Sequence, residues 1–370
     1  MTQSNDHGPA RARLTASRRA VLIAAGMAPV MVDHALAAGS PAPLFLALNE
    51  CAYPPSSRVA QAIAAETGQL SRYADPADAG RLTATLARIE QVTPDQIVLG
   101  DVLEPLGRYL AAGTGGSFVY SLPGYTALVD AAKPLGGRGV GVPLDRGLGN
   151  DLAALSAATG SDTRALFLVN PHNPSGTVTP RAAWHAFLAE AAHRTLVIVD
   201  EAYIEYDEPG DSAVALTRSG ANVAVFRTFD KIHALAALPF GYAVVPLALG
   251  RALRAAGIGD PHALSRLALA AAAVAVEDTT RVAAARAANL AARERLHVAI
   301  DALGLKRSAS RGNFVFFRSP VGGDTLRARL IAGGIVPAHA FAPLNDWVRI
   351  TVGNDAEVTR TIAVLRAALV

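Results

Sequence analysis

The stretch ALFLVNPHNPSG at residues 165–176 and the stretch LVIVDEAY at residues 196–203 each open with an apolar run of strand length and close with polar residues. Alanine-rich stretches of helical length separate these runs from others of the same kind, at residues 96–99, 117–120, 139–142, 223–226 and 241–245. Strands that are apolar on both faces and alternate with helices are typical of a mostly parallel sheet covered by helices on each side. The sequence therefore predicts an α/β fold.

The last third of the chain has a different pattern. A long alanine- and arginine-rich stretch from about Ala263 to Leu303 predicts helical structure, and two strand-like runs follow at residues 312–317 and 347–352. This pattern predicts a smaller α+β domain after a boundary near residue 255.

Polar residues follow three of the predicted strands, where a parallel sheet binds its ligands. They lie at residues 170–176, 200–203 and 227–231. Within them, Asp200 and Lys231 would be costly in an apolar sheet unless they were paired. Taken singly, each group has a plain alternative, because Asn-Pro pairs form turns, an aspartate can cap a helix and a lysine can be a solvated surface charge. Their order and spacing along the chain favour a functional site.

From about Leu48 to the C-terminus, these motifs resemble the fold-type I pyridoxal-phosphate aminotransferases of class I/II, in the histidinol-phosphate aminotransferase-like branch. The resemblance implies an aspartate aminotransferase-like fold with a large cofactor-binding domain and a smaller α+β domain. We therefore expect four segments: an export leader at residues 1–37, an N-terminal arm with part of the small domain at 38–74, the large domain at 75–255 and the C-terminal small domain at 256–370.

The resemblance also assigns roles around the ring of pyridoxal 5'-phosphate, the expected cofactor. Lys231 corresponds to the catalytic lysine that holds the cofactor and moves the proton at the substrate Cα. Asp200 corresponds to the carboxylate that keeps the ring nitrogen protonated. Tyr203 and Asn173 would donate hydrogen bonds to the phenolic oxygen, and Tyr125 would lie against the ring face.

Flanking motifs imply substrate-binding residues and a second subunit. Arg349, in a VRITVG stretch, matches the arginine that grips the substrate carboxylate as a bidentate pair. Asn313 and Tyr53 match two further family positions near the substrate, although Asn313 could be purely structural. Tyr73, in an RYADP stretch, matches a tyrosine that reaches the cofactor of the other subunit, which implies a homodimer with shared sites.

The part that should bind the cofactor phosphate departs from the family. Thr228 and the backbone at Leu103 and Glu104 remain as expected donors. The family serine is replaced by Asp230 and the family arginine by Pro239, which removes a charge-assisted contact and adds a like charge. Either another cation, such as His233 or Arg227, compensates, or the protein no longer holds the cofactor.

Composition excludes several other classes of protein. The chain has 370 residues, of which 51% are hydrophobic and 18% charged, and no apolar run reaches the roughly 18 residues of a membrane span. The single cysteine, Cys51, excludes a disulfide scaffold and a cysteine-ligated zinc site, and we expect no metal. Four arginines and two aspartates lie in the first 37 residues, so the rest carries a net charge of only +1. Nucleic-acid binding therefore has little support.

The N-terminal segment predicts export. Arg18 and Arg19 precede a short apolar run that ends at Val32, and Ala35-Leu36-Ala37 follows. Paired arginines before such a run resemble a twin-arginine signal, which predicts cleavage after Ala37 and a periplasmic protein without a stable membrane anchor. The alternative is an amphipathic extension without an export role, in which case the protein stays in the cytoplasm.

The leading functional hypothesis is a homodimeric aminotransferase that moves an amino group between an amino acid and a 2-oxo acid. A pyridoxal-phosphate enzyme of another reaction type, such as a racemase, lyase or oxidase, would use the same Lys231 and Asp200. A non-catalytic exported binding protein on a degenerate aminotransferase fold is the third hypothesis, and Asp230 with Pro239 is the feature that supports it.

Overall fold

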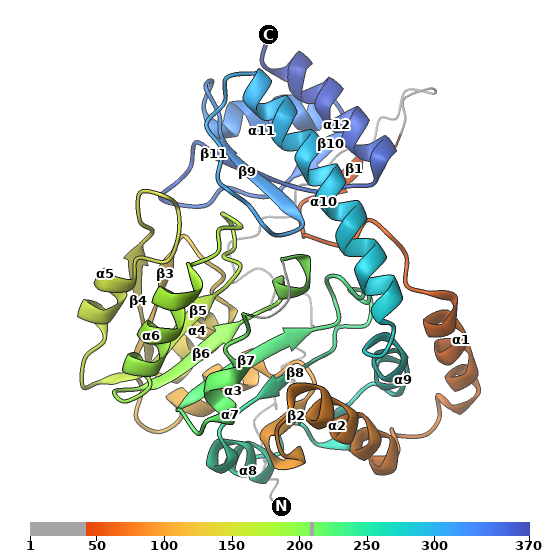
Figure 1. The fold of residues 1–370 in the computed structure, drawn as a ribbon, viewed down its shortest axis with the longest axis vertical. Helices are drawn as coiled ribbons and strands as arrows, with labels where there is room; N and C mark the ends of the chain where they lie inside the picture. The colour runs from red at the N-terminus through yellow and green to blue at the C-terminus, as the bar shows by residue number, and fades with distance from the viewer. Residues whose placement is uncertain (1–41, 208–210) are drawn as a thin grey trace, which may run out of the picture. The chain divides into compact units, whose positions relative to one another are not determined.

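The computed structural model describes residues 42–207 and 211–370, and Pro43–Val370 forms one compact unit. The predicted leader at residues 1–37 lies outside the described residues. The central feature is a seven-stranded sheet with the strand order β2-β8-β7-β6-β5-β3-β4 (Figure 1). Its strands are β2 (Ile97–Leu99), β3 (Gly116–Leu122), β4 (Gly137–Pro143), β5 (Thr163–Val169), β6 (Leu196–Asp200), β7 (Val223–Thr228) and β8 (Gly241–Val244).

All seven strand predictions in this region are confirmed, and so is the mostly parallel sheet. Strands β4, β3, β5, β6 and β7 run parallel, whereas β8 is antiparallel to both of its neighbours. Residues 229–240 join β7 to β8 without a helix, as expected for an antiparallel connection, because a parallel crossover usually contains one.

Helices cover both faces of this sheet because its strands alternate apolar side chains between them. In β6, Val197 and Val199 contribute to one core, and Leu196 and Ile198 contribute to the other. The first core is covered by α2 (Pro76–Glu90), α5 (Leu152–Ala158), α6 (Arg181–Ala191), α7 (Val214–Arg218) and α9 (Arg266–Ala275), with α1 (Ser57–Glu66) packed on α9. The second core is covered by α3 (Leu103–Ala111), α4 (Ala127–Ala132) and α8 (Leu247–Ala255).

The contact between α3 and α4 depends on one glycine. A Cβ atom at Gly107 of α3 would lie 2.2 Å from the carbonyl oxygen of Leu128 in α4. Glycine therefore lets the two helices approach closely and holds the first turn of α3 beside the ends of β2 and β8.

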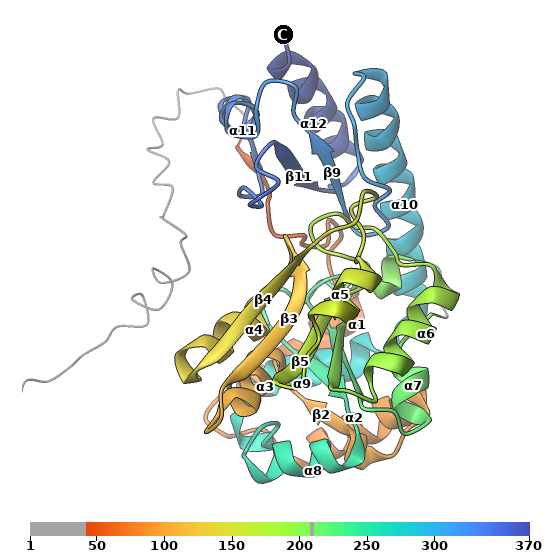
Figure 2. The same cartoon turned by 90° about the vertical axis from the view of Figure 1, so that its left-hand side faces the viewer.

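A third, smaller core involves the C-terminal elements, which Figures 1 and 2 show beside the central sheet. Two small sheets contribute to it, one antiparallel and one parallel. Its elements are β1 (Leu44–Leu46), α10 (Thr279–Ala302), β9 (Phe314–Arg318), α11 (Gly323–Ala332), β10 (Ile335–Pro337), β11 (Trp347–Thr351) and α12 (Asp355–Ala368). The N-terminal strand β1 pairs with β10, so the chain crosses back to its own C-terminal region.

The helical structure expected from about Ala263 to Leu303 is present as α9 (Arg266–Ala275) and α10 (Thr279–Ala302). The structure has two helices there, and the side chain of Asp278 accepts a hydrogen bond from the backbone N–H of Arg281 (3.2 Å) at the start of α10. An aspartate in this position favours a new helix start over continuation of the previous helix. Within residues 42–207 and 211–370, no helix is long and apolar enough to cross a membrane. The predicted boundaries at residues 74 and 255 remain predictions.

Candidate active site

The polar ends of three neighbouring strands meet at one edge of the sheet. Val169 at the end of β5 is in register with Asp200 of β6, and Asp200 is in register with Phe226 of β7. Lys231 follows β7 after a short turn. The three polar clusters that the sequence separates by dozens of residues are thus brought together, as expected for the carboxyl edge of a parallel sheet.

A chain of hydrogen bonds links four predicted or neighbouring site residues. Arg349 donates to Oδ1 of Asn173, whose Nδ2 donates to the hydroxyl of Tyr203 at 3.4 Å. The same hydroxyl accepts a second bond from Nδ2 of Asn49 at 3.0 Å. Tyr203 is buried and its ring meets Phe314 edge-on, so the hydroxyl is fixed in position.

Arg349 is a buried cation without a carboxylate partner in the described part of the chain. It is 5% exposed, one terminal nitrogen donates to the carbonyl of Ala47 (2.6 Å), and Nε has no partner. Its guanidinium lies 5.0 Å from the ring centre of Phe341 and 5.4 Å from that of Phe314. Burial lowers the pKa of Arg349 to about 10, which still leaves it charged at neutral pH. A buried, unpaired guanidinium fits a carboxylate ligand.

Asp200 is the matching buried anion. It is 7% exposed, its Oδ1 accepts the backbone N–H of Ala202 (2.9 Å), and it forms no salt bridge among the described residues. Burial raises the pKa of Asp200 to about 6, an effect that the nearby Lys231 opposes. A cation beside this carboxylate would offset the free-energy cost of burying its charge. The protonated ring nitrogen of pyridoxal 5'-phosphate is such a cation.

Lys231 lies between these groups and the N-terminal arm. Its Nζ donates to the carbonyl of Leu48 at 3.3 Å, and it has no salt bridge to a carboxylate in the residues described. Tyr125 follows β3 near the same edge and is 45% exposed. Burial raises the pKa of its hydroxyl, and Asp200 and Asp101 raise it further, which places Tyr125 close to both carboxylates.

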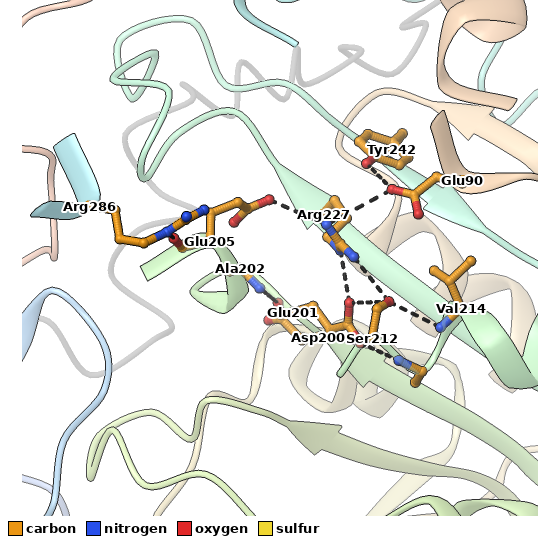
Figure 3. A network of polar contacts seen from close by, with 11 residues as sticks. Glu90, Asp200, Glu201, Ala202, Glu205, Ser212, Val214, Arg227, Tyr242 and Arg286 are labelled. Carbon is orange, nitrogen blue, oxygen red and sulfur yellow. Dashed lines mark hydrogen bonds and ion pairs between the residues drawn. The ribbon is translucent and has the colours of Figure 1, made fainter. Parts of the chain in front are cut away.

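Of the two side chains expected to replace the family arginine, one is already paired and the other is neutral. Arg227 is enclosed by Glu201 (2.8 Å), Glu205 (3.4 Å) and Glu90 (3.9 Å), as Figure 3 shows. Burial lowers the pKa of His233 to about 4, so this side chain is neutral at pH 7. Compensation for Pro239 by either of them therefore stays a prediction, and it would need Arg227 to leave its carboxylate partners or His233 to donate as a neutral ring.

The part of the site that is expected to bind the cofactor phosphate contains backbone hydrogen-bond donors, but carboxylates lie there as well. Helix α3 begins at Leu103 without a side-chain cap, and the N–H groups of Leu103 and Glu104 in its first turn have no carbonyl partner within a helix. Such a helix start attracts anions. Thr228 contributes a hydroxyl beside it, but Asp101 and Asp230 also lie at this end.

Three predicted residues lie further from this cluster. Tyr73 is 77% exposed and its ring meets His262 edge-on, so its hydroxyl does not reach the site of its own chain. Burial raises the pKa of Tyr53, which lies near Asp355 at the start of α12. Asn313 donates to the backbone carbonyls of Asn49 (2.9 Å) and Glu50, and thus holds the N-terminal arm in place.

Asn49 is the main site residue that the sequence predictions omitted. It is 1% exposed and has a positive φ of 56°, a conformation that asparagine tolerates better than most residues. Its backbone N–H donates to the hydroxyl of Thr351 (3.0 Å), and its side chain reaches Tyr203. An asparagine directly after the apolar residues 44–48 was the available signal. No cluster of residues suited to a metal ion occurs in the ranges that the structure describes.

Comparisons with known proteins identify the family that this fold and site define. Residues 43–365 match the family "Aminotransferase class I and II", so the chain belongs to that family. It is 36% identical to histidinol-phosphate aminotransferase 1 of Cupriavidus pinatubonensis, over 87% of this chain and 86% of that one. It is 34% identical to an aromatic amino acid aminotransferase of Corynebacterium jeikeium, over 89% of each chain.

A solved relative has the same fold. The histidinol-phosphate aminotransferase of Sinorhizobium meliloti, solved in complex with pyridoxal-5'-phosphate, superposes with a TM-score of 0.80 at 29% identity, over 90% of this chain and 92% of that one. The predicted fold type, the class of enzyme and pyridoxal 5'-phosphate as the cofactor are thereby confirmed. The unpaired Asp200, the fixed Tyr203 hydroxyl and the accessible Lys231 fit the ring of this cofactor.

Proposed function

We propose that this aminotransferase transfers an amino group from an amino acid with a free α-carboxylate to a 2-oxo acid, with Lys231, Asp200 and Arg349 as its central residues. The observation that carries the proposal is the geometry of three buried or half-buried charges at one sheet edge. Arg349 and Asp200 each lack a salt bridge in the described chain, and Lys231 lies near Asp200 with only a backbone carbonyl as its hydrogen-bond partner.

The cofactor, when bound, supplies an electron-withdrawing ring that makes the substrate Cα–H bond acidic. Lys231 provides the amine that holds the cofactor. Once the substrate has released this amine, it would move the proton between the substrate Cα and the cofactor carbon. Asp200 stabilises the positive charge on the ring nitrogen. Tyr203 and Asn173 position the ring through their hydrogen bonds, and Arg349 orients the substrate carboxylate so that Cα–H faces Lys231.

Nitrogen tracing tests this reaction directly. The enzyme is supplied with a 15N-labelled amino acid and an unlabelled 2-oxo acid, and the products are measured by mass spectrometry. Transamination predicts label in the new amino acid and a 2-oxo acid that forms only when the acceptor is present. Ammonia, carbon dioxide or an inverted stereocentre without an acceptor would instead identify a lyase, oxidase, decarboxylase or racemase.

We further propose a homodimer whose sites are completed by Tyr73 of the second subunit. Four large side chains of the N-terminal part are unusually exposed in the single chain, namely Phe45 (63%), Leu48 (62%), Leu70 (64%) and Tyr73 (77%). Large exposed apolar side chains within one segment, here residues 45–73, support the presence of a subunit interface. Mixing Lys231→Ala protein with Tyr73→Phe protein should restore activity, because a hybrid dimer would contain one site with both residues. Additive, uncomplemented activities would contradict shared sites.

Export to the periplasm is the third part of the proposal. The pair Arg18 and Arg19 before an apolar run, and Ala35-Leu36-Ala37 after it, support a twin-arginine signal. In a Gram-negative host, the wild-type chain should be recovered in the periplasmic fraction in a shortened form. The double variant Arg18→Lys and Arg19→Lys should remain full-length in the cytoplasm, and equal export of both chains would contradict the proposal.

A further inference from the structure

The phosphate end of the cofactor site is occupied in part by a side chain of the protein itself. Asp230 Oδ1 accepts the backbone N–H of Phe240 at 3.3 Å. The hydroxyl of Thr228 accepts the N–H of Asp230 at 3.0 Å and donates to the carbonyl of Phe240 at 3.4 Å. Both donors are therefore already used within the protein, the N–H of Phe240 by a carboxylate and the hydroxyl of Thr228 by a carbonyl.

The surroundings add a second negative charge. The backbone N–H of Gly100 donates to the carbonyl of Gly241 (2.9 Å), which places Asp101 beside the loop that contains Phe240. Burial raises the pKa of Asp101, and both Glu104 and Asp230 raise it further, so the three carboxylates interact.

The cations near this end are few. On α3, Arg108 pairs with Glu104 at 3.4 Å. On β7, Arg227 is enclosed by glutamates, and the neighbouring His233 is neutral at pH 7. Lys231 is the amine that the cofactor itself engages under the proposed function. Within the described residues, the attraction for a phosphate therefore rests on the N–H groups at the start of α3 and is opposed by Asp101 and Asp230.

We propose that Asp230 is a cofactor-specificity residue that takes the place of the phosphate at its donors, so that this protein distinguishes only weakly between pyridoxal 5'-phosphate and phosphate-free pyridoxal. The inference rests on the proposed role of Lys231 as the cofactor lysine. Hydrogen bonds to a charged group are stronger than those between neutral groups. The occupied N–H of Phe240 and the nearby like charges therefore offset most of the gain that the helix start provides.

The test compares dissociation constants, which do not depend on turnover. The full chain is titrated with each of the two compounds at pH 8, and binding is followed by absorption and by tryptophan fluorescence. The wild-type protein should bind the two forms with constants that differ by less than tenfold. Asp230→Ser should increase the preference for the phosphorylated form by at least tenfold, mainly through tighter binding of that form.

Two further variants keep the result interpretable. Asp230→Asn removes the charge but retains an acceptor for the N–H of Phe240, so it should change the preference in the same direction by a smaller factor, even if Asp230→Ser fails to fold. Asp346→Asn makes the matched change at a carboxylate that is 54% exposed and pairs loosely with Arg318 (3.7 Å), and it should behave as the wild type.

A pH series adds a second readout. Protonation of Asp230 removes its repulsion, and burial raises the pKa of this carboxyl group. From pH 8 to pH 6, binding of the phosphorylated form should therefore strengthen more in the wild type than in Asp230→Asn. Protonation of the phosphate itself, with a pKa of about 6, affects both proteins alike.

Three results decide the matter. A small wild-type preference that grows in both Asp230 variants supports the inference. A wild-type preference above tenfold, or a preference that neither variant changes, overturns it and leaves the proposed function intact. If neither compound forms a covalent bond with Lys231 on borohydride reduction, the proposed function fails and the inference fails with it.

Discussion

Asp200 and Glu201 are neighbours in the chain, and both are buried, but the structure surrounds them in opposite ways. Glu201 accepts a hydrogen bond from the N–H of Ala213 (2.7 Å). It also accepts bonds from the hydroxyl of Ser212 (2.8 Å) and Nε of Arg227 (2.8 Å), as Figure 3 shows. Asp200 accepts only the N–H of Ala202 and forms no salt bridge in the described chain, although the amine of Lys231 is nearby.

The difference separates a structural carboxylate from a functional one. Because a buried charge is costly unless it is paired, the cation for Glu201 is part of the fold. Asp200 has no salt-bridge partner among the described residues, which leaves its carboxylate available to a cationic ligand. The same distinction applies to Arg227, which is enclosed by carboxylates, and Arg349, which is not.

The largest effect is expected from Arg227→Met, which leaves Glu201, Glu205 and Glu90 without their shared cation. Loss of one partner from a buried ion pair typically costs about 3–5 kcal/mol. Because burial raises the pKa of Glu201 and of Glu205, these two groups can take up protons as the pH falls, and the loss of unfolding free energy should be larger at pH 8 than at pH 5. Denaturant unfolding at both pH values measures it, and an equal loss at both would indicate a packing defect instead.

Asp200→Asn should reduce kcat/KM by about a hundredfold to a thousandfold, the usual range for removal of one electrostatic contact in a catalytic site. The amide cannot keep the ring nitrogen protonated. The matched variant Asp207→Asn changes another carboxylate on the same segment, one that pairs with Arg311 (2.7 Å). It should retain activity within about threefold, and similar losses in both variants would contradict the special role of Asp200.

Although Asp200→Asn should lower the activity, it should raise the unfolding free energy of the cofactor-free protein. The folded-state pKa of Asp200 is raised from 3.8 to about 6, so its charge opposes folding above pH 6 and has no effect well below pH 4. The variant should therefore unfold with a free energy higher by about 2–3 kcal/mol at pH 8, and by much less at pH 4. A destabilised variant at pH 8 would show that Asp200 already has an internal partner.

The smallest effect is expected from Tyr242→Phe, at the edge of the polar contacts that surround Arg227. Tyr242 donates a hydrogen bond to Glu90 Oε1 at 2.6 Å, and Tyr242→Phe removes it while Arg227 remains nearby. A loss of about 1 kcal/mol in unfolding free energy is expected, with no change in the affinity for the cofactor. A change in cofactor affinity larger than tenfold would show that this network also serves the site.

The sequence predicted the sheet and the residues at its edge because both depend on local pattern. Apolar runs of strand length gave all seven strands, and the polar residues after β5, β6 and β7 were therefore placed at one edge. The antiparallel direction of β8 and the break before α10 depend on a connection without a helix and on the cap at Asp278, which periodicity alone does not show.

Partners from distant parts of the chain could not be predicted in this way. Glu90 of α2 reaches Arg227 of β7 only because the two elements pack on each other, and no sequence spacing indicates that contact. For the same reason the sequence left Arg227 open as a phosphate ligand. Asn49 acts through a positive φ and a bond to Tyr203, and both become visible only when the N-terminal arm is placed.

The most direct test of the site uses the small number of lysines in the chain. The sequence contains only Lys133, Lys231 and Lys306, and Lys133 is already paired with Asp130 at 2.7 Å on the surface. The purified protein is incubated with pyridoxal 5'-phosphate, reduced with borohydride, digested and mapped by mass spectrometry. We expect the cofactor adduct on the peptide that contains Lys231, and its absence from the Lys231→Ala protein. An adduct confined to Lys133 or Lys306, or no adduct at all, would contradict the assignment of this sheet edge as the active site.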